Sequence, residues 1–192
     1  DEKDANDNLT GKRVTTSDYA SASYYYVNKS SLPKVYGGFN TSLSWKGFDL
    51  SAIFAYSIGG YIYNRDITMI LHNGSLEGRD WSTEILKRWT PENRYTDVPA
   101  LSTTSNNWNS ASTRFLQNNS YMRLKNLTLS YDLPKQWISK LALSSVQVFV
   151  QGDNLFTIHR NQGLDPEQGI TGITYYRYPA MRTISGGINL SF

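Results

Sequence analysis

The sequence predicts an all-β chain: about five antiparallel strands at the C-terminal end of a larger transmembrane β-barrel, with long extracellular loops. Apolar and polar residues alternate with period two over five stretches, as in strands that show one apolar face to lipid. Short and long connections alternate between these stretches, which is typical of outer-membrane barrels with short periplasmic turns and long outer loops. The last stretch ends on Phe192, and barrel strands place aromatic residues at the membrane interface.

Composition is compatible with this fold class and excludes several others. No apolar run approaches the ~18 residues of a membrane helix, and alternating strands leave the mean hydropathy unremarkable at −0.48. The net charge is +3, and the basic residues form no cluster dense enough for nucleic-acid binding. The absence of cysteine excludes a disulfide framework and cysteine metal sites.

The first two strands are predicted as a hairpin after a polar loop. Residues 1–33 are polar and are interpreted as that loop. Residues 34–45 and 48–58 then alternate apolar and polar side chains along their whole length. The pair Lys46-Gly47 between them predicts a tight turn, because glycine tolerates a positive φ.

A long irregular connection is predicted over residues 59–118. Within it, residues 80–89 are expected to form a short helix, capped by Asp80 or Ser82 and stopped by Pro91. A connection of this length is uncommon inside a compact soluble domain. It is typical of the outer-facing loops of a large barrel.

Three further strands are predicted at residues 120–133, 145–156 and 181–192. Pro134 ends the first of them, and the connection up to Leu143 is short, with a helical turn around Trp137. Residues 158–180 form another long loop, rich in glycine and tyrosine. The terminal strand then alternates up to Phe192.

Five strands cannot close a barrel, because the smallest membrane barrels have about eight. Unpaired edges in lipid would also leave backbone groups unsatisfied. We therefore expect residues 1–192 to be the C-terminal part of one larger barrel domain. The connection pattern places the long loops, at about 1–33, 59–118 and 158–180, outside the cell and the C-terminus on the periplasmic side.

Three stretches of sequence carry a resemblance to a known family. They are residues 88–93 (RWTPEN) with 96–101 (TDVPAL), residues 121–134 (YMRLKNLTLSYDLP), and residues 148–157 (VFVQGDNLFT) with 163–167 (GLDPE). In this order, and with the terminal strand, they resemble the C-terminal end of the SusC/RagA family of TonB-dependent outer-membrane transporters of Bacteroidetes. The resemblance covers about residues 33–192 and implies a barrel of about 22 strands with a plug in its lumen.

The resemblance also implies a function and a set of partners. Family members import large nutrients, either glycan oligosaccharides or peptides, together with a SusD-like surface lipoprotein that acts as a lid. The TonB complex supplies the energy through upstream segments that this chain does not contain. The other implied partners are the N-terminal part of the barrel with its plug, outer-membrane lipid and the oligosaccharide or peptide substrate, whereas nucleic acid is not expected.

Two groups of residues are candidates for functional contacts. The first matches the signal read by the barrel-assembly machinery and consists of Ser185, Gly187, Leu190 and Phe192. The second consists of loop residues that could touch the substrate or the lid: Trp81, Trp108, Asp165, Tyr175 and Tyr176. Packing within the loops is the competing interpretation for each aromatic residue, and a structural role competes for Asp165.

No catalytic, cofactor-binding or metal-binding residues are identified, so we predict that the chain is not an enzyme. His72 and His159 lie in different loops, which gives no metal cluster. The acidic residues Glu77, Asp80 and Glu84 are interpreted as a solvated surface.

Two other functions stay open at this point. A passive porin-like channel would have similar strands, and only an upstream plug domain separates it from an importer. A soluble glycan-binding β-sandwich is the third interpretation. It leaves the apolar faces and the terminal Phe192 unexplained.

Overall fold

The computed structural model describes residues 4–6, 8, 10–12, 14, 16, 18–72, 74, 76, 78–102, 107–139, 143–161, 163–167 and 169–192. The chain divides into two compact units. The sheet unit comprises Ser30–Ile62, Gln117–Gly172 and Arg177–Phe192, and the loop unit comprises Asp1–Lys29, Tyr63–Leu116 and Ile173–Tyr176.

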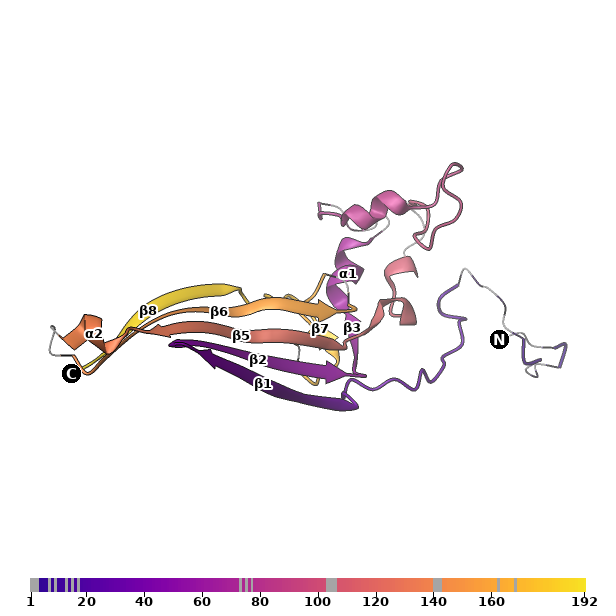
Figure 1. Cartoon of the computed structure of the whole chain (residues 1–192). Helices are drawn as coiled ribbons and strands as arrows, with labels where there is room; N and C mark the ends of the chain where they lie inside the picture. Colours follow the sequence, from indigo (N-terminus) through magenta and orange to yellow (C-terminus); the bar gives the residue numbers. More distant parts are fainter. Residues whose placement is uncertain are drawn as a thin grey trace. The chain divides into compact units, whose positions relative to one another are not determined.

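The sheet unit is built on five long antiparallel strands. They are β1 (Val35–Trp45), β2 (Phe48–Ile58), β5 (Tyr121–Asp132), β6 (Ser145–His159) and β8 (Thr183–Ser191). Their order in the sheet is β1-β2-β5-β6-β8, so neighbouring long strands in the sequence are also neighbours in space (Figure 1). The predicted all-β, antiparallel architecture is therefore confirmed. Strand β6 extends three residues beyond the predicted end at Phe156, because it stays paired with β5 as far as His159.

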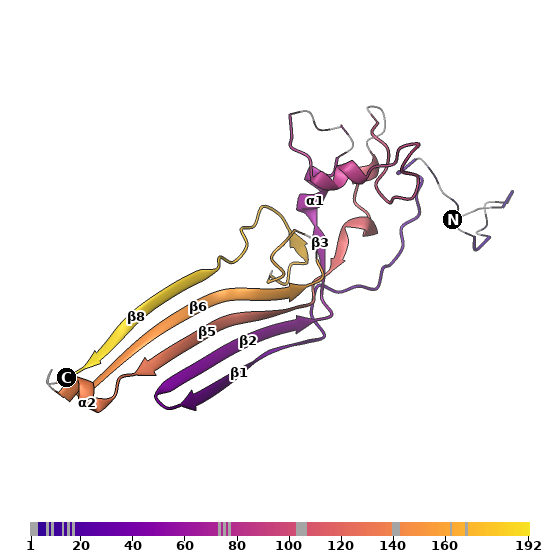
Figure 2. The same ribbon diagram turned by 45° about the horizontal axis from the view of Figure 1, so that its top comes forward.

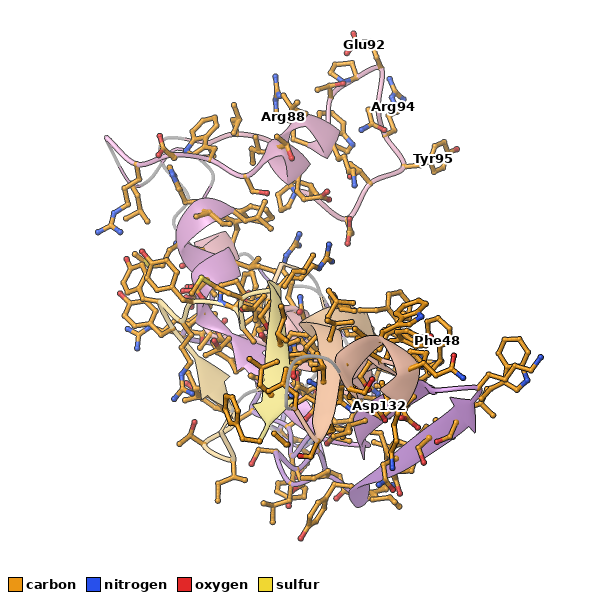
Figure 3. All side chains as sticks on the ribbon, turned by 60° about the vertical axis from the view of Figure 1, so that its left-hand side comes forward. Phe48, Arg88, Glu92, Arg94, Tyr95 and Asp132 are labelled. Carbon is orange, nitrogen blue, oxygen red and sulfur yellow. The ribbon has the colours of Figure 1, made fainter. Side chains whose placement is uncertain are left out.

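The predicted turn between β1 and β2 is present. Lys46 and Gly47 both have positive φ, 48° and 86°, which is the pattern of the type I′ turn that fits the twist of a hairpin. The Asp132 N–H donates to the Gly47 carbonyl at 2.8 Å and ties this turn to β5. Figure 3 shows Phe48 and Asp132 together at this end of the sheet.

A β-bulge in the middle of β5 keeps the apolar residues on one side of the sheet. The pairing of β5 skips Lys125 on both sides, opposite β2 and opposite β6. Leu124 and Leu127 are three residues apart, so strict alternation would place them on opposite faces. The extra residue shifts the register and returns both to the same face.

The short connection between β5 and β6 contains the helical turn α2 (Lys135–Ile138), as predicted. Ile138 is buried there, whereas Trp137 is exposed. The C-terminus lies beside α2 in both ribbon views (Figure 2). The Ser144 N–H donates to the Ser191 carbonyl at 2.8 Å, which holds the end of β8 at this connection.

The loop unit contains short helices rather than a single long loop. Helix α1 (Arg65–Ile70) begins after Asn64, whose side chain accepts a hydrogen bond from the Ile67 N–H at 3.1 Å. The 3-10 helices η1 (Thr83–Lys87), η2 (Asn107–Asn109) and η3 (Thr113–Phe115) follow. In the described part of the chain, no helix is long and apolar enough to cross a membrane.

The helix predicted over residues 80–89 is shorter than expected and is the 3-10 helix η1. Ser82 does cap it, accepting a hydrogen bond from the Glu84 N–H at 3.3 Å. The helix stops before Trp89, because Arg88 is extended and the Trp89 N–H donates to the Val98 carbonyl at 2.8 Å. Glu92, Arg94 and Tyr95 lie at the tip of the loop after η1 (Figure 3).

Three short strands form a second sheet with the order β4-β3-β7. They are β3 (Tyr61–Asn64), β4 (Leu116–Asn118) and β7 (Ile173–Thr174). Tyr63 and Asn64 pair in parallel with Ile173 and Thr174. The segments predicted as long loops therefore contain regular structure that the sequence pattern did not indicate.

Candidate functional surfaces

One side of the five-stranded sheet is a continuous apolar surface, which we call the apolar face. The pairing places Leu43, Leu50, Leu129 and Val150 in one row, and Trp45, Phe48, Tyr131, Val148 and Ile188 in the next. Beyond the bulge, the face continues through Phe39, Phe54, Leu124 and Phe156. The rings of Phe39 and Phe54 stack at a centroid distance of 4.7 Å.

The apolar face is exposed rather than buried within the chain. Leu43, Val150 and Ile188 are 67%, 47% and 64% exposed. Monomeric soluble proteins rarely expose contiguous apolar patches larger than a few hundred Å². A face of this kind across five strands requires a covering medium or partner.

The opposite side of the same strands is polar, and we call it the polar face. One row consists of Ser42, Ser51, Thr128, Gln151 and Ser185. The side chains hydrogen-bond to each other: Asn126 Nδ2 donates to Asp153 Oδ1 at 2.8 Å, and Thr128 Oγ1 donates to Asn126 Oδ1 at 2.9 Å. Such a sheet can separate an apolar medium from water, because each face matches one of them.

A buried ionic cluster holds the loop after β6 against the polar face. Arg123 is 3% exposed and uses all three nitrogens of its guanidinium. Its Nη2 donates to Asp165 at 2.5 Å, its Nη1 to Glu167 at 2.8 Å, and its Nε to Thr157 Oγ1 at 3.0 Å. Lys125, the bulged residue, adds a second cation to Glu167 at 2.8 Å. We call these five residues the Arg123 cluster.

Two backbone N–H groups donate to the Asp165 carboxylate in addition to Arg123. The Ala180 N–H donates to its Oδ2 at 2.6 Å and the Glu167 N–H to its Oδ1 at 2.9 Å. Burial alone would raise the pKa of Asp165, but the Ala180 hydrogen bond, Arg123 and Glu167 N–H together hold it below the ordinary 3.8. Its carboxylate oxygens are thus engaged within the chain, which favours the structural role over direct contact with a ligand.

Trp81 is held in the loop unit by a buried histidine. Its Nε1 donates to His72 Nδ1 at 3.1 Å, and the two rings meet edge to face. Burial lowers the pKa of His72. A hydrogen bond with the Arg79 backbone raises this pKa, and the nearby positive charge of Arg79 lowers it. Trp81 nevertheless remains partly exposed. Its packing against His72 is therefore compatible with a contact to the substrate or the lid.

The other loop aromatics also have partners within the loop unit. Arg114 lies 4.4 Å from the ring centroid of Trp108 and donates to the Asp97 carbonyl at 2.7 Å. The ring centroids of Tyr175 and Tyr176 are 4.1 Å apart, so the structure brings these two candidate contact residues together. Tyr176 has a positive φ of 50°, and its N–H donates to Asp66 at 2.9 Å.

The residues of the predicted assembly signal alternate across β8 as expected. Ser185 and Gly187 lie on the polar face and Leu190 on the apolar face, paired with Gln151, Phe149 and Val146. A Cβ at Gly187 would lie 2.8 Å from the Phe149 ring, so a side chain at this position would require the ring to move. The terminal Phe192 is 92% exposed.

The acidic residues of the long middle connection show no common site. Asp80 is exposed, and Glu84 pairs with Lys87 at 2.7 Å. Glu77 lies outside the described residues. Within the described ranges, no group of three or more histidine, cysteine and acidic side chains could hold a metal ion.

Sequence reasoning missed Arg123. An arginine in an alternating strand resembles any exposed polar residue, and its two acidic partners lie more than forty residues further along the chain. The available signal was an arginine and a lysine two residues apart on β5 with two acids, Asp165 and Glu167, at the same spacing in a glycine-proline loop.

Comparisons with curated proteins identify related sequences. The chain is 33% identical to the TonB-dependent receptor P3 of Formosa agariphila over 166 residues, 81% of this chain and 16% of that protein. It is 27% identical to the TonB-dependent receptor SusC of Bacteroides thetaiotaomicron over 168 residues, 87% of this chain and 16% of that protein. The chain thus spans about a sixth of the length of these relatives. No family model matches it.

Solved structures share the fold of the chain. The RagAB peptide importer in its closed-closed state is similar with a TM-score of 0.81 and 35% identity, over 100% of this chain and 20% of that chain. The same importer in its open-open state gives a TM-score of 0.80 and 36% identity, over 93% of this chain and 19% of that chain.

Proposed function

Because the chain belongs with the TonB-dependent receptors of the SusC/RagA type, we propose that its five long strands form part of the wall of an outer-membrane importer. The observation that carries this proposal is the pair of faces on one sheet. The apolar face matches lipid, and the polar face matches a water-filled or plugged lumen. Both edges of the sheet, β1 and β8, would pair with strands of the remaining barrel, since lipid does not tolerate an open edge.

We also propose where the chain lies in the barrel and how it is oriented. Residues 1–192 are the C-terminal part of a single barrel domain. The β1–β2 turn, the α2 connection and the C-terminus lie at one end of the sheet, and this end faces the periplasm. The longer connections at about 1–33, 59–118 and 158–180 lie outside the cell.

We also propose the substrates and partners of the whole receptor on the basis of this family. The whole receptor imports large nutrients, peptides or oligosaccharides, and a SusD-like surface lipoprotein covers its outer loops. Similarity to a peptide importer supports peptides as the first class to test. The TonB complex acts through segments upstream of this chain, and the chain itself catalyses no reaction.

Two rival functions have less support. A passive porin-like channel explains the two faces equally well, but the related sequences are TonB-dependent receptors. A soluble glycan-binding β-sandwich would bury an apolar face against a second sheet. The described residues contain no sheet that covers it: Leu43 and Ile188 stay 67% and 64% exposed.

The test is uptake by the intact receptor in its own cells. We expect uptake of fluorescent oligopeptides or oligosaccharides to depend on this receptor and to stop when TonB is deleted. A plug-deleted receptor provides the control, because it should pass small solutes without TonB. Uptake that continues at full rate without TonB would instead identify a passive channel.

A further inference from the structure

A second feature of the polar face is a cavity beyond the bulge, at the end of β6. Its volume is about 500 Å³, within the ~300–1,000 Å³ range of small-ligand pockets. Thr157 and His159 of β6 form its floor, together with Arg123 of β5. The loop segments around Asp165 and from Arg177 to Arg182 form its walls.

The charges that line this cavity do not cancel. Asp165 is the acidic lining residue, and Arg123 and two backbone N–H groups already engage its carboxylate. Arg177 and Arg182 also line the cavity. Among the described residues, neither has an acidic partner within ion-pair distance. The cavity therefore has two arginine side chains whose charge no described acid neutralises.

The walls of the cavity are fixed by contacts that do not use these two arginines. The Arg123 cluster holds Asp165, whose Oδ2 accepts the Ala180 N–H at 2.6 Å. Asn119 Nδ2 donates to the Pro166 carbonyl at 2.8 Å. The backbone on both sides of the cavity is thus positioned before any ligand binds, which lowers the ordering cost of binding.

We propose that Arg177 and Arg182 bind a carboxylate group of the imported nutrient in this cavity. An arginine guanidinium presents two parallel N–H donors that match the two oxygens of a carboxylate. The carboxylate could be the C-terminus of an oligopeptide or the acid group of a uronate sugar, since both offer the same chemistry. The inference rests on the proposed import function and adds the chemical group that the lumen recognises.

The test uses the intact receptor in detergent, with segments upstream of this chain present, and two pairs of probes. One pair is an oligopeptide with a free C-terminal carboxylate and the same peptide as its carboxamide. The other pair is oligogalacturonate and its methyl ester. Dissociation constants are measured by titration calorimetry for the wild type and for the double variant Arg177→Gln/Arg182→Gln. The control is Arg160→Gln, which removes one positive charge from the same loop but does not line the cavity.

We expect the wild type to prefer one carboxylate probe over its neutral partner. The double variant should bind that probe about tenfold or more weakly, as loss of a charge-assisted hydrogen bond predicts. Arg160→Gln and the neutral probes should show no change. Whether the peptide or the uronate probe responds identifies the source of the carboxylate.

Three results would overturn the inference: a wild type without carboxylate preference, a double variant that binds like the wild type, or an equal loss in Arg160→Gln. TonB-dependent uptake is measured in parallel to keep the two proposals apart. Unchanged TonB-dependent uptake without carboxylate preference would leave the import function intact and reject only this site. Carboxylate binding that is lost in the double variant, without any TonB-dependent uptake, would retain the site and reject the importer.

Discussion

Arg123 is the residue on which the position of the loop after β6 depends. It is buried, yet its three guanidinium nitrogens are matched by two carboxylates and a threonine hydroxyl. A buried ion pair is stable only when its partners complete its hydrogen bonds, and removing one partner leaves an uncompensated charge. The cluster therefore fixes the loop strongly but tolerates little change.

We predict that Arg123→Ala destabilises the loop by about 3–5 kcal/mol, the usual cost of breaking a buried ion pair from one side. The buried carboxylate of Asp165 would lose its charged partner. The measurement is limited proteolysis within residues 160–182 of the folded, membrane-inserted receptor. Arg160→Ala serves as the control because Arg160 is exposed. Equal protease resistance of Arg123→Ala and the wild type would contradict this role.

The ionisation of Asp165 makes the stability of the loop after β6 depend on pH. Its folded-state pKa lies below the ordinary 3.8, so its ionised form stabilises the fold. This contribution is complete above about pH 3.8 and is lost as the pH falls below that value toward the folded-state pKa. We expect loop proteolysis by an acid-active protease to be constant down to this pH and to increase below it. In Asp165→Asn the loop should be cleaved readily at every pH, and an unchanged profile in that variant would argue against Asp165 as the titrating group.

At the scale of elements, the five long strands were predictable, whereas the short strands β3, β4 and β7 and the end of the helix were not. The strand from Phe48 to Ile58 was predicted with the bounds that β2 has, because one apolar face gives strict alternation. The bulge at Lys125 was not predicted, since only the pairing with both neighbours reveals the extra residue. The helix predicted over residues 80–89 is present with its Ser82 cap but ends at Lys87, because the Trp89 N–H donates to the Val98 carbonyl, a contact that local spacing does not encode.

The terminal strand offers a test at this scale. Gly187 lies under the Phe149 ring, and a Cβ there would approach the ring to 2.8 Å. We predict that Gly187→Val lowers the amount of assembled receptor in the outer membrane several-fold, because the valine side chain and the Phe149 ring cannot occupy the same space. The double variant Gly187→Val/Phe149→Ala should recover assembly, since the ring no longer occupies the space. Assembly is measured as heat-modifiable protein on gels. Failure of the double variant to recover would indicate that the assembly machinery itself requires the glycine.

At the scale of the whole molecule, we propose that the two ends of the sheet lie on opposite sides of the outer membrane. The alternation of short and long connections in the sequence predicts this orientation. It could not indicate the structure inside the long connections, such as α1 and β7, because these short elements depend on contacts between distant residues like Tyr176 and Asp66.

Cysteine labelling in intact cells tests the orientation. Tyr95 is fully exposed at the tip of the loop after η1, and Lys46 lies in the turn between β1 and β2. We predict that a membrane-impermeant maleimide labels Tyr95→Cys in intact cells, whereas Lys46→Cys is labelled only after the outer membrane is opened. The reverse pattern would invert the proposed topology.

The proposed function depends most on the apolar face of the five-stranded sheet contacting lipid and the polar face contacting water. A spin-label scan along β5 of the membrane-inserted receptor, from Asn126 to Tyr131, measures this directly. We predict that accessibility to oxygen, which concentrates in lipid, peaks at Leu127, Leu129 and Tyr131. Accessibility to a water-soluble nickel complex should instead peak at Asn126, Thr128 and Ser130 or be low where the plug covers them. Equal accessibility of both sets to the water-soluble reagent, or oxygen maxima at Asn126, Thr128 and Ser130, would contradict the account.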